Sequence, residues 1–163
     1  MAKRVKIAKE DYLKGLNDII ENVQEAVDKI EHGSVQGLAD ALRYVGTESQ
    51  KKAPVEYGDL RGSLEISIDG TVIAKGVNNN PPGADGKRAK NPHVELAEVA
   101  EPPDSGKVGR ISYNAPYAAD QHEHTEYDHP KGGQAKYLES VLASEKNTIL
   151  QLIAGGIINN LEG

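Results

Sequence analysis

The apolar residues of this chain change their spacing twice, and this change limits the folds that the chain can adopt. In residues 13–30 the apolar positions recur three or four residues apart, with charged residues between them. That spacing is typical of an amphipathic helix, and we expect one of about twenty residues here. His32 and Gly33 are predicted to end it, because glycine suits the left-handed cap of a helix.

A second helix is predicted to follow directly. Ser34 belongs to the residue types favoured at helix N-caps, and the apolar positions of residues 35–45 again fall at helical spacing. We expect this helix to fade after Gly46 and to end at Ala53 and Pro54, because the residue before a proline is pushed out of the helical region.

The spacing then becomes two, as in a strand with one buried face. Residues 63–68 alternate strictly, and Asp69-Gly70 is a favoured two-residue hairpin turn into a partner strand over residues 71–77. Two further strands are predicted at residues 93–100 and 107–113. The hairpin makes the predicted sheet antiparallel.

Helical spacing returns from about Gln134 and continues toward the C-terminus. Residues 155–163 are predicted to be a loose tail that orders only against a neighbouring subunit. Residues 78–92 are rich in Asn, Pro and Gly and are predicted to form an exposed, mobile loop or arm. The chain is therefore expected to be a single α+β domain over residues 1–163, with N-terminal helices packed on an antiparallel sheet of about four strands and a C-terminal helix.

Composition narrows the classes of function. The chain has no Phe, no Trp and one Met, so its core must be aliphatic and tyrosine must supply any aromatic anchors at an interface. A net charge of -6 disfavours general affinity for nucleic acid or anionic membranes. The absence of cysteine excludes disulfides, thiolate catalysis and cysteine metal sites. No segment has the length of a membrane span or the pattern of a signal peptide, so a soluble, unexported protein is expected.

The stretch from Tyr113 to Leu142 is the strongest candidate for function, because it is a polar loop between a strand and a helix. Arg61 is expected to fix the turn after the second helix through carbonyl or carboxylate hydrogen bonds, and Gly132 and Gly133 to serve backbone geometry. The residues predicted to make contacts with partners are polar or aromatic: Tyr117, His122, Glu123, His124, Tyr127, His129 and Tyr137. Tyr137 has a second interpretation, as a core residue.

The histidines of this stretch also permit a catalytic interpretation. The sequence from His122 to Glu126 resembles the start of the zinc-protease motif HExxH, but the second histidine of that motif is replaced by Glu126. The alternative function is therefore a small metal-dependent hydrolase using His122, His124 and His129. Other catalytic templates, such as a nucleophile elbow, a P-loop or a Cys-His pair, do not occur. We expect no catalytic residue, no metal site and no cofactor.

Two blocks of sequence resemble one protein family. Residues 53–64, APVEYGDLRGSL, resemble the AP-x-x-x-G-x-L-R-x-S-[LI] segment of head-tail joining proteins of long-tailed bacteriophages, also labelled tail-completion or minor capsid proteins. Residues 115–119, APYAA, residues 121–123, QHE, and residues 132–139, GGQAKYLE, are similar to the strand end and helix start of the same family. The chain differs from the family at residues 124–128, where many members have a Gly-Thr, and in a longer stretch at residues 78–92.

The resemblance implies a structural protein of the phage virion and no catalysis. It implies a homo-oligomeric ring, sixfold as a hexamer, in the neck between the head-closure (connector) protein and the tail tube or tail terminator. DNA would pass through the lumen without specific binding, no membrane would be involved, and assembly would take place in the host cytoplasm. A binding module with no role in a virion is a third interpretation.

Overall fold

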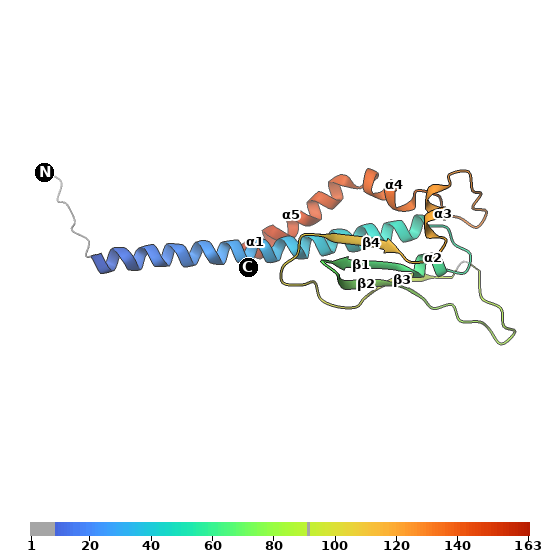
Figure 1. Cartoon of the computed structure of the whole chain (residues 1–163), viewed down its shortest axis with the longest axis horizontal. Coiled ribbons are helices and arrows are strands. Elements are labelled where there is room, and N and C mark those ends of the chain that lie inside the picture. The colour runs from blue at the N-terminus through green and yellow to red at the C-terminus, as the bar shows by residue number, and fades with distance from the viewer. Residues whose placement is uncertain (1–8, 91) are drawn as a thin grey trace.

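The computed structural model describes residues 9–90 and 92–163, and it has an elongated shape built in three layers (Figure 1). An antiparallel sheet forms the first layer, the long helix α1 (Lys9–Lys52) lies on it, and the helices α4 (Tyr137–Ser144) and α5 (Lys146–Glu162) lie on α1. Two short helices, α2 (Asp59–Gly62) and α3 (Ala118–Glu123), lie at the end of the sheet where α1 ends. The predicted α+β class, with helices on an antiparallel sheet and a C-terminal helix, is confirmed.

The N-terminal helical region is one helix rather than the two predicted. α1 has 44 residues and passes through the predicted break at His32 and Gly33 without interruption. Ser34 does not cap a second helix, because its Oγ donates to the carbonyl oxygen of Ile30 at 2.7 Å within α1. Gly33 instead lies against α5, where a Cβ would come within 2.6 Å of the carbonyl oxygen of Gly156. The glycine permits a close contact between helices and does not end one.

The sheet has the strand order β3-β2-β1-β4. Its members are β1 (Leu64–Ile68), β2 (Thr71–Asn78), β3 (Val94–Glu98) and β4 (Gly109–Tyr113). Asp69 and Gly70 join β1 to β2 with φ angles of 45° and 87°, as a two-residue turn with both central residues left-handed requires. All four predicted strands are therefore present, each within a few residues of its predicted ends.

Two apolar clusters hold the layers together. The first joins α1 to the sheet and consists of Val35, Ala39, Leu64, Ile66, Ile68, Ile73 and Ala74. The second lies at the end of α1 and consists of Ala53, Leu60, Ala118 and Tyr137. The first cluster is entirely aliphatic, as the composition requires, whereas the second is built around a tyrosine ring.

The C-terminal region departs from the prediction in two ways. The predicted single helix is divided at Glu145 into α4 and α5. The predicted loose tail, residues 155–163, is the second half of α5, which continues to Glu162. Gly156 is buried in the contact between α5 and α1, so this segment is ordered by its own chain rather than by a neighbouring subunit.

The connection between β2 and β3 is exposed at its tip but held at its base. Arg88 forms two hydrogen bonds with the carboxylate of Asp59, both 2.7 Å long, and its Nε donates to the carbonyl oxygen of Asn80 at 2.9 Å. Asn80 is only 7% exposed, and its amide nitrogen donates to the carbonyl oxygens of Tyr57 and Ala89. The tip, residues 81–87, is exposed as predicted, but the two sides of this connection are fastened to each other and to the body. Among the helices that the structure describes, none is long and apolar enough to cross a membrane.

Candidate functional site

Tyr137 organises the region in which the candidate contact residues lie. Its side chain is 1% exposed, its hydroxyl donates to the carbonyl oxygen of Ala118 at 3.0 Å, and its ring meets the rings of Tyr113 and His122 edge to face, with centroids 4.9 and 4.8 Å away. Burial raises the pKa of Tyr137 to about 12. Tyr137 is therefore a core residue, which was the second of its two predicted roles. A direct contact with a partner does not fit its buried position.

The C-terminal end of α1 is capped by two segments, one close to it in sequence and one far away. The guanidinium of Arg61 donates to the carbonyl oxygen of Ala53 through Nε at 2.9 Å and through Nη2 at 2.7 Å, and Nη2 also reaches the carbonyl oxygen of Lys51 at 3.2 Å. The backbone N–H of Gln134 donates to the carbonyl oxygen of Lys52 at 2.8 Å. The last carbonyl groups of a helix need such partners. The predicted role of Arg61 is confirmed.

Gly132 and Gly133 bring the second of these segments into place. Both have φ angles of 96°, which L side chains rarely adopt. A Cβ on Gly133 would lie 2.4 Å from the Cα of Pro54, so the backbone at residue 133 rests directly on the end of α1. The predicted backbone role of the two glycines is confirmed, and Gly133 has the additional role of permitting this contact.

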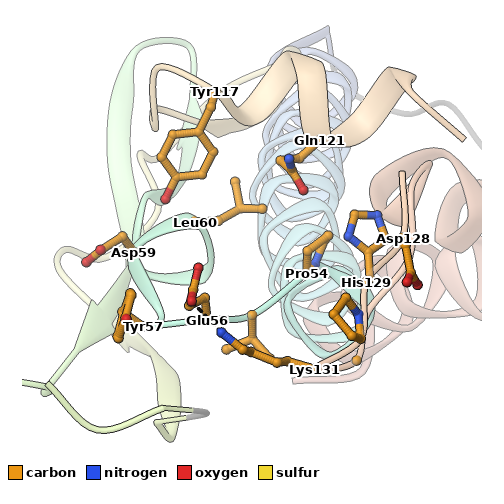
Figure 2. A pocket seen from close by; sticks show the side chains of 13 residues that line it. Pro54, Glu56, Tyr57, Asp59, Leu60, Tyr117, Gln121, Asp128, His129 and Lys131 are labelled. Carbon is orange, nitrogen blue, oxygen red and sulfur yellow. Dashed lines mark hydrogen bonds and ion pairs between the residues drawn. The ribbon is translucent and has the colours of Figure 1, made fainter. Parts of the chain in front are cut away.

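A hollow of about 390 Å³ opens between these segments (Figure 2). The connection from α1 to α2, the helix α3 and the loop over residues 128–132 form its walls. Tyr117, directly before α3, and Gln121, within α3, face the hollow. Leu60 lies between them and the link after α1, and His129 faces the hollow from the loop (Figure 2). The hollow therefore collects residues that are far apart in the sequence, including the candidate contact residues Tyr117 and His129.

Charged side chains surround Tyr57, which lines the hollow. Lys131 is paired with Glu56, and the Lys131 ammonium and the Arg88 guanidinium lie 5.9 and 5.8 Å from the centroid of the Tyr57 ring. The hydrogen bond from Lys131 holds the pKa of Glu56 below its usual value, and the one from Arg88 does the same for Asp59. Within the described residues, the buried Nε2 of His129 has no hydrogen-bond partner.

The candidate contact residues next to Tyr137 form an ion network. Glu123 accepts a hydrogen bond from Lys136 and lies 2.7 Å from the Nδ1 of His122. Lys136 has a left-handed backbone with φ 53°, and its N–H donates to the carbonyl oxygen of His122 at 2.8 Å. Lys136 and then His122 hold the pKa of the Glu123 carboxyl below its usual value. This network ties α3 to the start of α4 and leaves Glu123 on the surface.

His124 and Tyr127 lie together at a different place on the surface. Their rings stack with centroids 4.8 Å apart, and His124 Nδ1 is 2.5 Å from Glu126. His122, His124 and His129 thus have three different environments and do not face a common point. Across residues 9–90 and 92–163, no group of three or more His, Asp or Glu side chains is placed to hold a metal ion.

Sequence reasoning did not single out Tyr57, Gln121 or Lys131, which line the hollow. Tyr57 and Gln121 both lie inside the family-like blocks, at residues 53–64 and 121–123, whereas Lys131 is brought in only by the fold. The chain matches no known family model, no curated protein and no solved structure.

Proposed function

We propose that this protein is a structural subunit of a bacteriophage neck. Its copies form a ring, sixfold by the resemblance, that joins the head-closure protein of a DNA-filled head to the tail tube or tail terminator. The role is one of contact rather than catalysis. The proteins would assemble in the host cytoplasm and remain in the virion.

The observation that carries this proposal is that the two family-like sequence blocks form one structural unit. Residues 53–64 and 115–139 are far apart in the chain, yet Arg61 caps the end of α1, Gly133 rests on Pro54, and Leu60, Ala118 and Tyr137 share one apolar cluster. Short motifs that agree with a family by chance have no reason to converge in this way. Their convergence supports the resemblance that the sequence alone carries.

The shape of the subunit also supports a joining role. The N-terminal part of α1 projects from one end of the body, and the short helices α2 and α3 with residues 79–90 lie at the other end (Figure 1). The hollow is lined in part by Leu60 of α2 and Gln121 of α3, so it belongs to this second end. A subunit with separate contact surfaces at its two ends can touch different neighbours in a stack of rings. We assign Tyr117, His122, Glu123, His124, Tyr127 and His129 to contacts at the second end.

The net charge fits a passage for DNA. A chain with a formal charge of -6 repels phosphate groups, so a ring of such chains would let DNA slide through the lumen without specific binding.

Deletion of the gene from the phage genome that carries it tests this proposal directly. Negative-stain electron microscopy of the lysate is expected to show DNA-filled heads beside complete, unattached tails. Addition of the purified protein to this lysate should restore joined, infectious particles. Normal infectious particles without the gene would overturn the neck role.

A further inference from the structure

The N-terminal part of α1 leaves an apolar stripe uncovered. This part of the helix projects beyond the rest of the molecule, and every described side chain from Leu13 to Glu25 is exposed (Figure 1). Seven large aliphatic side chains, each 42–60% exposed, face outward along it: Leu13, Leu16, Ile19, Ile20, Val23, Val27 and Ile30. Monomeric proteins rarely expose a contiguous apolar patch of more than a few hundred Å².

The stripe has the spacing of a helix-helix seam. Leu13, Ile20 and Val27 occupy one position of a seven-residue repeat, labelled a. Leu16, Val23 and Ile30 occupy position d, so the intervals alternate between three and four residues. Side chains at a and d are those that interlock between helices of a coiled coil. The stripe is therefore shaped to receive another helix rather than a loop or a flat sheet.

The same face of α1 is covered by a helix farther along. Gly33 and Gly37 continue the stripe toward the C-terminus of α1, and there they contact α5 at Gly156 and Ile153. α5 runs antiparallel to α1, from the Tyr44 end toward Gly33, and it ends at Glu162. The exposed stripe thus extends a helix-helix contact that α5 is too short to complete.

The charge pattern fits a second copy of the same helix. The positions that flank the seam are uncharged at Asn17, Ile19, Gln24 and Ala26. The one charged flanking residue is Glu31, at the end of the stripe. The remaining carboxylates of the segment, Asp18, Glu21, Glu25 and Asp28, lie at positions b and f on the opposite face. Like charges beside the seam would repel an identical helix, and here the charges point away from it.

We propose that the stripe over residues 13–30 is the contact between copies of this chain, and that the projecting helices of neighbouring copies pack in parallel through it. Parallel packing follows from rotational symmetry, which gives every projecting helix of a ring the same direction. The inference rests on the proposed function for the presence of neighbouring copies, and it assigns the surface through which they meet.

Single-cysteine variants test this contact cleanly because the chain has no cysteine of its own. In Leu16→Cys the thiol lies in the seam, near one end of the stripe. Antiparallel helices would place the two thiols far apart, so only parallel, in-register helices bring them together. Asp18→Cys is the matched control on the opposite face of the same turn. With a short bis-maleimide, Leu16→Cys is expected to give cross-linked chains on a denaturing gel, whereas Asp18→Cys is expected to give almost none.

Sedimentation velocity of charge variants gives a second readout. Val23→Glu places a carboxylate in the seam and is expected to weaken self-association by roughly tenfold or more, because a buried, unpaired charge is costly. Lys14→Glu introduces the same side chain on the polar face and should change association by much less. Both substitutions lie outside the body of the molecule, so its unfolding transition should remain as in the wild type.

Two results would overturn the inference and are distinguishable from a failure of the neck role. If the wild type associates but Leu16→Cys does not cross-link and Val23→Glu associates normally, copies meet through another surface. If the wild type remains monomeric at high concentration, the stripe takes a helix of a different protein. The neck role itself stands or falls on the particles formed without the gene.

Discussion

Gly37 and Gly156 lie backbone against backbone where α5 crosses α1. A Cβ on Gly156 would come within 2.4 Å of the amide nitrogen of Gly37, and a Cβ on Gly37 would come within 2.4 Å of the carbonyl oxygen of Ile153. No side chain fits between the two helices at this point. Glycine is therefore required on both sides for the close approach, and the docking of α5 depends on it.

Gly156→Ala tests the importance of this crossing. The added methyl group has to push the helices apart, and such overpacking costs about 1–3 kcal/mol of the free energy of unfolding. Gly155→Ala is the matched control, because a Cβ at Gly155 meets nothing within 4 Å and alanine favours a helix. Urea denaturation should show a lower midpoint for Gly156→Ala alone. Equal midpoints for both variants would contradict the close contact.

Gly132 and Gly133 allow a similar comparison in the loop before α4. Both have φ 96°, so alanine is strained at either position. Only at Gly133 does the new Cβ also collide with Pro54, whereas Gly132 faces open space. We expect Gly133→Ala to lower the free energy of unfolding by about 1–3 kcal/mol more than Gly132→Ala. A difference near zero in thermal and urea unfolding would mean that residue 133 does not rest on α1.

Arg61→Ala is expected to destabilise the end of α1. It removes the partner of the Ala53 carbonyl group, and an unsatisfied buried acceptor costs about 1–3 kcal/mol. Arg110→Ala, at an exposed position on β4, serves as the control for the loss of one positive charge. Hydrogen exchange should be faster over the last turn of α1 in Arg61→Ala only. Unchanged protection there would argue against the cap.

The raised pKa of Tyr137 predicts that the folded chain loses stability at alkaline pH. Burial raises its pKa in the folded chain to about 12, above the usual value of 10.0. Folding therefore favours the neutral hydroxyl, and this contribution is fully present below about pH 10 and is lost as the pH rises toward 12. Tyr137→Phe should lose stability at neutral pH through the missing hydrogen bond to Ala118, and its stability should fall less steeply over this range. Parallel pH profiles for the two proteins would contradict the assignment.

Arg88 is expected to control the order of the connection between β2 and β3. Arg88→Ala removes both hydrogen bonds to Asp59 and the one to Asn80, so the base of the connection loses its attachment. Lys87→Ala is the neighbouring control, because the side chain of Lys87 is 84% exposed. Limited proteolysis between residues 79 and 90 should accelerate in Arg88→Ala and not in Lys87→Ala. Equal cleavage rates would show that the connection is held by other contacts.

Most of the sheet could be predicted from the sequence because its signals are local. Alternation over residues 63–68 and the pair Asp69-Gly70 determine two strands and the turn between them without reference to any other part of the chain. The role of Arg61 could also be predicted, because this arginine lies close in sequence to the end of α1, where free carbonyl groups need hydrogen-bond partners. The hollow could not be predicted, because its walls come from three segments that meet only after folding.

The sequence by itself determined where side chains prefer to be buried, and from that came the α+β class, the four strands and the amphipathic character of α1. Only the tertiary structure decided the meaning of the glycines. The sequence predicts a helix end at Gly33 and a loose tail from Gly155 onward, yet Gly33, Gly155 and Gly156 all lie inside helices, and Gly33 and Gly156 lie in the contact between α1 and α5. A glycine that ends a helix and one that admits a second helix look the same in sequence. The difference depends on what lies next to the missing Cβ in space, and that neighbour is more than a hundred residues away.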